Sequence, residues 1–135
     1  MKKYIAIIII LLNIFGVASC SSSKKEITKI DCYSINEAWE KTNIVAMIEG
    51  KDDLKTMTDF LDTAKKIEYP LETGLADGFL SVTYSDKSVE EWYIFCRMDL
   101  YMIAKTEDKA TWYTPAVPFN TINSLIASNQ VELPK

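Results

Sequence analysis

Four carboxylates in the second half of the chain are the residues best suited by type to act as an acid and a base. They are Asp86, Glu90, Glu91 and Asp99. Two carboxyl groups that converge in a cleft can protonate a leaving group and activate water, as in the hydrolysis of sugars. The alternative is a solvated strand edge, where acidic side chains discourage aggregation. We favour the second interpretation, because carboxylates in folded proteins are mostly exposed.

The composition excludes most other catalytic chemistries. The chain contains no histidine, which removes His-based triads, imidazole metal sites and the usual proton shuttle at neutral pH. It has only four glycines and no Gly-rich phosphate loop, and its acidic pairs lack the alternating spacing of a calcium loop. We therefore predict no cofactor, no metal site and no enzymatic activity.

Five aromatic residues form a candidate binding surface: Trp92, Tyr93, Tyr101, Trp112 and Tyr113. Neighbours on a strand point to opposite faces, so one member of each adjacent pair could lie in the core and the other on the surface. An uncovered face rich in Tyr and Trp could bind an envelope protein or a glycan. The alternative, which we favour, is that helices cover this face, because large exposed aromatic patches are unusual on monomers.

Cys32 and Cys96 could form a disulfide, which would contribute roughly 4 kcal/mol in the chain-entropy model. An exported compartment would allow such a bridge. The alternative is two separate buried thiols, and the sequence leaves both interpretations open. A catalytic role for either cysteine is not expected, because the chain has no histidine to activate a thiol.

Residues 1–19 are typical of a secretory signal peptide. Lys2 and Lys3 provide a positive start, and an apolar run follows from Tyr4 to Ala18. The run is too short for a transmembrane helix, which needs about 20 apolar residues. The alternative is a short membrane anchor that is never cleaved.

The apolar run ends in Val17-Ala18-Ser19-Cys20, which resembles the lipobox of bacterial lipoprotein precursors. The resemblance implies cleavage between Ser19 and Cys20, and attachment of a diacylglyceryl group to the Cys20 thiol. It implies further acylation of the new amino terminus in many bacteria, and two or three acyl chains make a stable anchor. The domain would then stand outside the cytoplasm, held at the cell membrane or the outer membrane by the lipid on Cys20.

The rest of the chain is acidic. The full sequence has a net charge of −4, although its signal segment contributes two lysines and no acid. Binding to nucleic acid or to anionic lipid headgroups needs a basic face. Neither is a predicted partner, and attachment to the membrane must come from the lipid.

Hydrophobic spacing and turn residues predict the elements. A capping box at Ser34–Glu37 predicts a short helix to Lys41, and the apolar run Ile44–Ile48 predicts a strand. Apolar residues three and four apart predict a long helix over Gly50–Tyr69, with acids in its first turn and lysines in its last.

The second half of the chain predicts strands and a final helix. Alternation predicts a hairpin of residues 79–84 and 89–97 around a polar turn. A third strand is expected over Leu100–Lys105, with Trp112-Tyr113 closing or extending it. A final helix is expected to begin at Asn120, whose side chain can cap it.

These elements predict an α+β fold, in which an antiparallel meander packs against the long amphipathic helix and the C-terminal helix. The order resembles small, mostly uncharacterised α+β lipoprotein domains of bacteria, on the pattern Leu80–Asp86 followed by Trp92-Tyr93. We expect four segments: signal peptide 1–19, lipidated Cys20 with a flexible tether 20–30, one domain 31–129, and a loose tail 130–135.

The function that these features favour is a lipid-anchored, non-enzymatic domain that binds another envelope component. One alternative is a carboxylate-dependent enzyme acting on cell-wall or sugar substrates, which would need two acids within about 5–10 Å of each other. Another is an inhibitor or exclusion lipoprotein, which would share the same sequence features and differ only in its partner.

Overall fold

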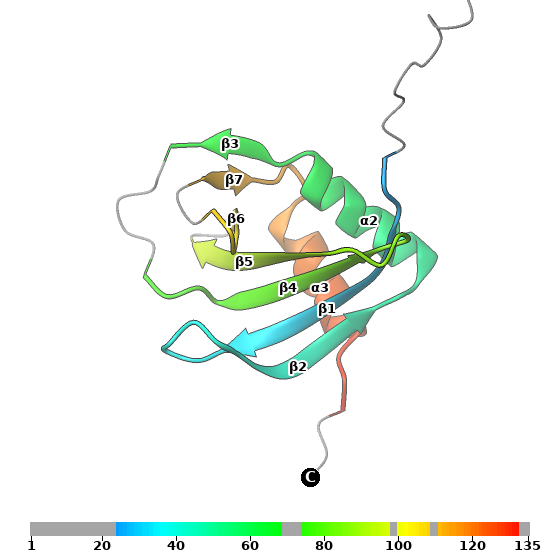
Figure 1. The fold of residues 1–135 in the computed structure, drawn as a ribbon, viewed down its shortest axis with the longest axis horizontal. Helices are drawn as coiled ribbons and strands as arrows, with labels where there is room; N and C mark the ends of the chain where they lie inside the picture. The colour runs from blue at the N-terminus through cyan, green and yellow to red at the C-terminus, as the bar shows by residue number, and fades with distance from the viewer. Residues whose placement is uncertain (1–23, 69–73, 98–99, 109–110, 133–135) are drawn as a thin grey trace, which may run out of the picture.

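A computed structural model describes residues 24–68, 74–97, 100–108 and 111–132. In these residues seven antiparallel strands form one sheet, in the order β2-β1-β4-β5-β6-β7-β3. Figure 1 shows this order from β3 at the top of the view to β2 at the bottom. The strands are β1 (Ile27–Ile35), β2 (Lys41–Ile48), β3 (Lys65–Ile67), β4 (Gly78–Tyr84), β5 (Val89–Arg97), β6 (Leu100–Lys105) and β7 (Trp112–Thr114).

Two helices cover one face of the sheet. Helix α2 (Lys51–Asp62) buries Met57 and Phe60, and helix α3 (Phe119–Ser128) buries Ile122 and Leu125. Strand residues two apart share a face, so alternate residues meet the helices. The sheet side of this core consists of Ile27, Ile30, Cys32, Ala46, Ile48, Leu80, Val82, Trp92, Ile94, Tyr101 and Ile103. Among the described residues, neither helix is long and apolar enough to cross a membrane.

A second, smaller core lies on the opposite face, where side chains rather than a helix provide the cover. Phe95 and Trp112 meet there with ring centroids 4.3 Å apart, and the small Ala104 of the intervening strand leaves room for this contact. Trp39, from the β1–β2 turn, packs edge-on against Tyr93 at 5.0 Å. The side chains on both faces of the central strands are therefore buried.

The two edges of the sheet are protected in different ways. The chain after α3 runs along the outer edge of β2, where Met47 N donates to Asn129 O and Val131 N donates to Val45 O, both at 3.1 Å. The other edge is the short β3, which presents the exposed Lys65 and Lys66. Short, charged edge strands resist pairing with other chains.

The structure confirms the α+β class, the antiparallel meander and its two covering helices. It also confirms strands at Ile44–Ile48 and Leu100–Lys105 and the hairpin, whose strands β4 and β5 pair from Gly78↔Ile94 to Thr83↔Val89. Trp112-Tyr113 extend the sheet as part of β7.

Several boundaries were predicted wrongly. The helix expected from Ser34 does not form: Ser34 ends up in β1, where its hydroxyl bonds Thr42 Oγ1 of β2 at 2.7 Å, and the next residues form a turn. The long helix stops at Asp62, and Lys65–Ile67 instead pair with β7 as β3. The last helix begins at Phe119, with Pro118 in the cap position expected for Asn120.

The segment limits also change at both ends of the domain. The tether expected to extend to residue 30 gives way to β1 at Ile27, and Ile30 is fully buried. The tail expected from residue 130 is partly ordered, because Gln130 pairs with Ala46. Residues 1–23, including Ser19 and Cys20, lie outside the described residues, as do residues 133–135.

Replacing Phe60 with alanine tests how strongly the helix-covered core holds the fold. Phe60 is fully buried, and its ring packs edge-on against Tyr101 at 5.7 Å. We expect Phe60→Ala to lower the free energy of unfolding by about 3–5 kcal/mol. Urea denaturation followed by tryptophan fluorescence measures the free energy of unfolding. The control Lys55→Ala lies on the exposed face of α2 and should change the free energy of unfolding by less than ~0.5 kcal/mol. Equal losses of stability in the two variants would contradict this packing.

Candidate functional site

The candidate aromatic surface is not a surface. Trp92, Tyr93, Tyr101 and Trp112 are buried, with at most 7% of each residue exposed, and Tyr113 is half-buried. Trp92, Tyr101 and Tyr113 pack in the helix-covered core, whereas Tyr93 and Trp112 pack in the second core. The favoured interpretation, a covered face, is therefore the one that the structure shows. Helices cover one face of the sheet, whereas the side chains of the second core cover the other.

The candidate carboxylates do not converge. Asp86 pairs with Lys25 at 2.8 Å, and hydrogen bonds from Lys25 and Ser88 hold the pKa of Asp86 well below its usual range. Glu91 pairs with Lys41 at 2.6 Å. Asp99 lies outside the described residues.

Glu90 is also engaged by its neighbours. It accepts hydrogen bonds from Tyr84 Oη at 2.9 Å and from Lys105 Nζ at 3.1 Å. Burial and the bond to Glu90 raise the pKa of Tyr84, so this hydroxyl stays protonated and keeps donating. As sequence neighbours on β5, Glu90 and Glu91 point to opposite faces of the sheet. No acid–base pair forms among the described members of this group.

Cys32 and Cys96 stay separate thiols, so the disulfide does not form in this structure. They lie on β1 and β5, and β4 runs between these strands. Cys32 is buried, and burial, with nearby Asp31, raises its pKa from 9.0 to about 12. The reactive form of a cysteine is the thiolate, so Cys32 is inert at neutral pH.

A hollow opens where α3 passes over the ends of β1, β4 and β5. Its volume is about 280 Å³, close to the small end of the range of ligand pockets. We name it the Cys96 hollow. It is lined by residues of the sheet, of the chain just before β4, and of α3: Cys32, Tyr33, Ser34, Val45, Asp77, Gly78, Phe79, Ile94, Cys96, Tyr101, Asn123 and Ile126. A mostly apolar lining with a few polar groups is the usual character of a small-molecule site.

Gly78 creates part of this space. It starts β4, pairs with Ile94 and shares the helix-covered face with Leu80. A side chain there would project under α3, and an added Cβ would meet nothing closer than Tyr33 O at 3.5 Å, an ordinary contact. The glycine is therefore not required by its backbone conformation, and its effect is to leave the hollow open.

The polar groups of the hollow are held in fixed positions. Tyr101 Oη donates to Asn123 Oδ1 at 2.5 Å, and burial, with contributions from Cys96, Cys32 and Asp77, raises the pKa of Tyr101 to about 12. Asp77 Oδ2 accepts from Cys96 N at 2.7 Å and from Arg97 Nη1 at 2.6 Å. The Asp77 carboxylate thus holds the end of β5 in place through these two hydrogen bonds.

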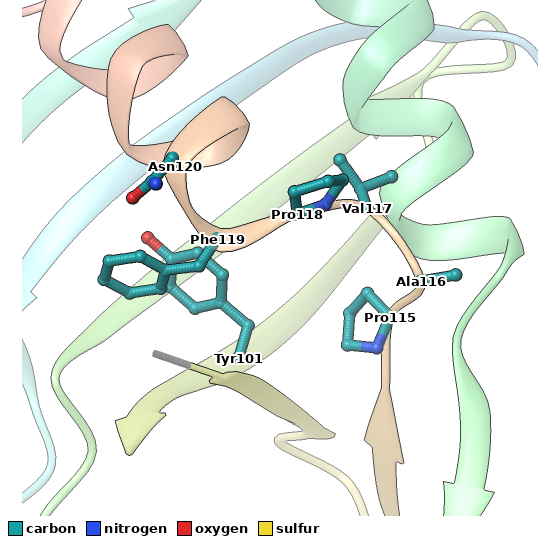
Figure 2. A pocket seen from close by; sticks show the side chains of 7 residues that line it. All are labelled: Tyr101, Pro115, Ala116, Val117, Pro118, Phe119 and Asn120. Atoms are coloured by element: carbon teal, nitrogen blue, oxygen red, sulfur yellow. The ribbon is translucent and has the colours of Figure 1, made fainter. Parts of the chain in front are cut away.

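A second hollow also has Tyr101 in its lining. Its volume is about 400 Å³, and it is lined by Tyr101 and by the segment from Pro115 to Asn120 that leads into α3. Figure 2 shows the ring of Phe119 lying over that of Tyr101, and their centroids are 4.9 Å apart. The Tyr101–Phe119 pair therefore forms part of the lining of this second hollow, and Tyr101 borders both spaces.

The chemistry that this arrangement supports is binding. Within the described ranges, no group of three or more Cys, Asp or Glu side chains could hold a metal ion. The sequence offers no histidine to activate the Cys96 thiol. Tyr101 and Cys96 were among the candidate residues predicted from the sequence. Gly78 and Asn123 were not, because their roles depend on how α3 crosses the sheet. For Gly78, the local signal in the sequence is a glycine that directly precedes the predicted strand 79–84.

Comparison with known proteins supports the fold. No protein-family model matches the chain, and no curated protein matches its sequence. Among solved structures, the fold is similar to that of a thioesterase-like protein from Clostridium sporogenes, with a TM-score of 0.55 and 13% sequence identity. The similarity covers 76% of this chain and 94% of that chain. At this level of identity the likeness is one of fold.

The two thiols should differ sharply in reactivity. In a Cys20→Ala protein at pH 8, we expect a thiol reagent to modify half-buried Cys96 and to leave buried Cys32 unmodified until denaturant is added. Thiol titration with and without denaturant measures this, and Cys96→Ser should abolish the native-state reaction. Equal rates at both cysteines, or no reaction before reduction of a bridge, would contradict the structure.

Proposed function

We propose that this chain is a lipid-anchored lipoprotein of the bacterial cell envelope, whose domain binds a small, largely apolar ligand in the Cys96 hollow without catalysing a reaction. The anchor and the ligand site are supported by separate observations. The first rests on the sequence before the domain, and the second on the geometry of the domain itself.

The anchor is supported by the lipobox-like Val17-Ala18-Ser19-Cys20 after a short apolar run. A diacylglyceryl group on Cys20, with or without an N-acyl chain, would hold the protein at the cell membrane or the outer membrane. Between Cys20 and the first described residue, Lys24, stand three serines. The domain would therefore follow closely on the lipid.

The observation that carries the binding role is the space left by Gly78 beneath α3. Close packing is the rule in protein interiors, yet a Cβ added at this position would meet nothing closer than Tyr33 O at 3.5 Å. A small apolar ring or chain fits the lining of Ile94, Ile126 and Val45, and the Cys96 and Asn123 side chains offer it polar contacts. This replaces the aromatic sheet face as the proposed point of contact with an envelope component.

The absence of catalysis is part of the proposal. The structural neighbour is thioesterase-like, and that name applies to the neighbour. In this chain the candidate acids Asp86, Glu90 and Glu91 are tied to lysines, and Cys32 is buried with a raised pKa. Neither a general base nor an activated nucleophile is apparent among the described residues of the Cys96 hollow.

Lipid attachment can be tested by metabolic labelling with an alkyne analogue of palmitate. We expect the wild-type protein to take up label and to partition into detergent, and Cys20→Ala to lose both properties, because the Cys20 thiol receives the lipid. Cys96→Ala is the matched control and should be labelled like the wild type. The lipid anchor would be contradicted if Cys20→Ala took up the palmitate label, or if the wild-type protein did not.

Ligand binding can be tested with indole, an uncharged and mostly apolar ring. We expect millimolar indole to shift the amide NMR signals of Cys32–Ser34, Gly78 and Asn123, and Gly78→Met to weaken this binding at least about tenfold by filling the space. Gly50→Met, at the exposed start of α2, is the matched control.

The Gly78→Met protein should remain folded, since a side chain in place of a strand glycine is expected to add about 0.5–1 kcal/mol to the free energy of unfolding. Urea denaturation checks this, so that lost binding is not confused with lost structure. Indole shifts that appear elsewhere, or that survive in Gly78→Met, would overturn the proposed site.

A further inference from the structure

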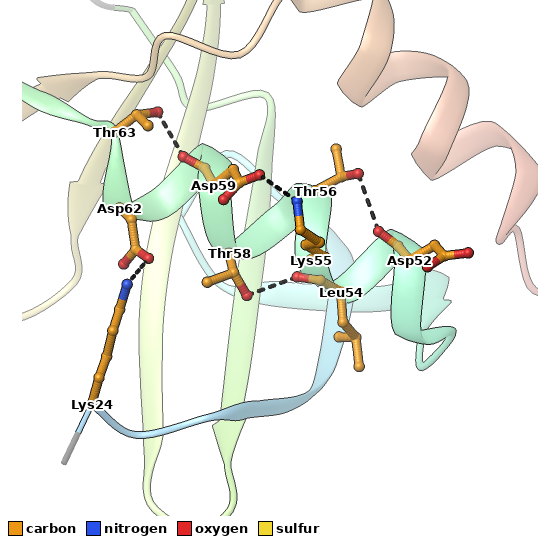
Figure 3. A network of polar contacts seen from close by, with 9 residues as sticks. All are labelled: Lys24, Asp52, Leu54, Lys55, Thr56, Thr58, Asp59, Asp62 and Thr63. Atoms are coloured by element: carbon orange, nitrogen blue, oxygen red, sulfur yellow. Dashed lines mark hydrogen bonds and ion pairs between the residues drawn. The ribbon is translucent and has the colours of Figure 1, made fainter.

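The described chain starts at a defined end of the domain. Lys24 forms an ion pair with Asp62 in the last turn of α2, as Figure 3 shows. Lys25 contacts the β4–β5 turn through Asp86 at 2.8 Å and Ser88 Oγ at 3.1 Å. Glu26 O accepts a hydrogen bond from Ser85 N of the same turn at 2.8 Å. We call this end, made of residues 24–26, Asp62 and the turn 85–88, the anchor end.

The Cys96 hollow lies toward the opposite end of the sheet. Strand β1 begins at Ile27, which pairs with Tyr84 of β4. It reaches the hollow at Tyr33, which pairs with Phe79. Ile27 and Tyr33 are six residue steps apart along the strand, or about 20 Å at ~3.3 Å per step. Figure 1 shows β1 running away from the β4–β5 turn toward the β1–β2 turn at the other side of the molecule.

Covalent geometry limits how far the anchor end can stand from Cys20. The four residue steps from Cys20 to Lys24 span at most about 14 Å when fully extended. The contacts of Lys24, Lys25 and Glu26 hold the start of the domain against α2 and the β4–β5 turn. A lipid on Cys20 would thus pull this end, and not the hollow, toward the bilayer.

We infer that the anchored domain stands with its anchor end toward the membrane and its Cys96 hollow toward the aqueous side, so that the hollow takes a ligand dissolved in the envelope fluid rather than an acyl chain from the bilayer. The inference rests on the lipid anchor proposed above. Charge is not the cause of the orientation, because Lys24 and Lys25 are both paired with carboxylates. The short connection to Cys20 sets it, together with the contacts that hold residues 24–26 against the domain.

Fluorescence quenching by the membrane surface tests the orientation. The full chain is expressed so that it is lipidated, carrying Cys96→Ser and one new cysteine. Ser85→Cys labels the anchor end, and Glu37→Cys, in the exposed β1–β2 turn, labels the far end. Each protein is labelled with bimane and reconstituted into phosphatidylcholine vesicles, with or without a nitroxide on the lipid headgroup. Buried Cys32 should not be labelled.

We expect the nitroxide to quench the Ser85→Cys label at least about threefold more than the Glu37→Cys label. Equal quenching, or stronger quenching at Glu37→Cys, would overturn the orientation while the anchor stands, provided that the proteins float with the vesicles. Proteins that fail to float would instead overturn the lipid anchor, and the orientation with it. Flotation therefore distinguishes the failure of the two proposals.

Discussion

The burial of β5 on both faces is the constraint on which the rest of the structure depends. This strand is the fourth of seven in the sheet, and its Trp92–Phe95 segment alternates between two cores. Helices α2 and α3 cover one face. Trp39 and the contact of Phe95 with Trp112 cover the other, across the small Ala104. Apolar side chains on both faces stabilise the strand by removing their area from water. In the part of the chain that the structure describes, the large apolar residues left exposed are Leu75 and Val89.

The alternation of β4, the apolar run of β2 and the period of α2 were sufficient to predict the class of the fold from sequence, because each follows a single local periodicity. The errors occurred where tertiary pairing overrode a local signal. Ser34 begins a good capping box but extends β1 against β2, and Lys65–Ile67 leave a helical pattern to pair with β7. The site was harder to predict: Tyr101 and Cys96 were noticed for other roles, whereas Gly78 and Asn123 acquire their meaning only when α3 lies across the sheet.

The same architecture relates the hollow to the anchor. The antiparallel register places the start of β1 and the β4–β5 turn at one end, and the Cys96 hollow near the other. Asp77 and Arg97 tie the chain before β4 to the end of β5, and Tyr101 bonds Asn123 beneath α3, so the rim of the hollow is fixed. The proposed lipid on Cys20, four residues before Lys24, would hold the first end at the membrane and leave the second end in solution. The proposed binding and orientation therefore both depend on this sheet, whereas the proposed attachment depends on Cys20.

Native mass spectrometry of the lipoprotein extracted from its own envelope tests the central claim most directly, because it asks whether the Cys96 hollow is occupied by a cellular ligand. We predict that the wild-type protein and the Gly50→Met control carry a small non-covalent mass that Gly78→Met lacks, with the lipid mass on Cys20 present in all three. Two results would contradict the assignment of the hollow as the binding site: no added ligand mass on any of the three proteins, or a ligand mass that Gly78→Met retains.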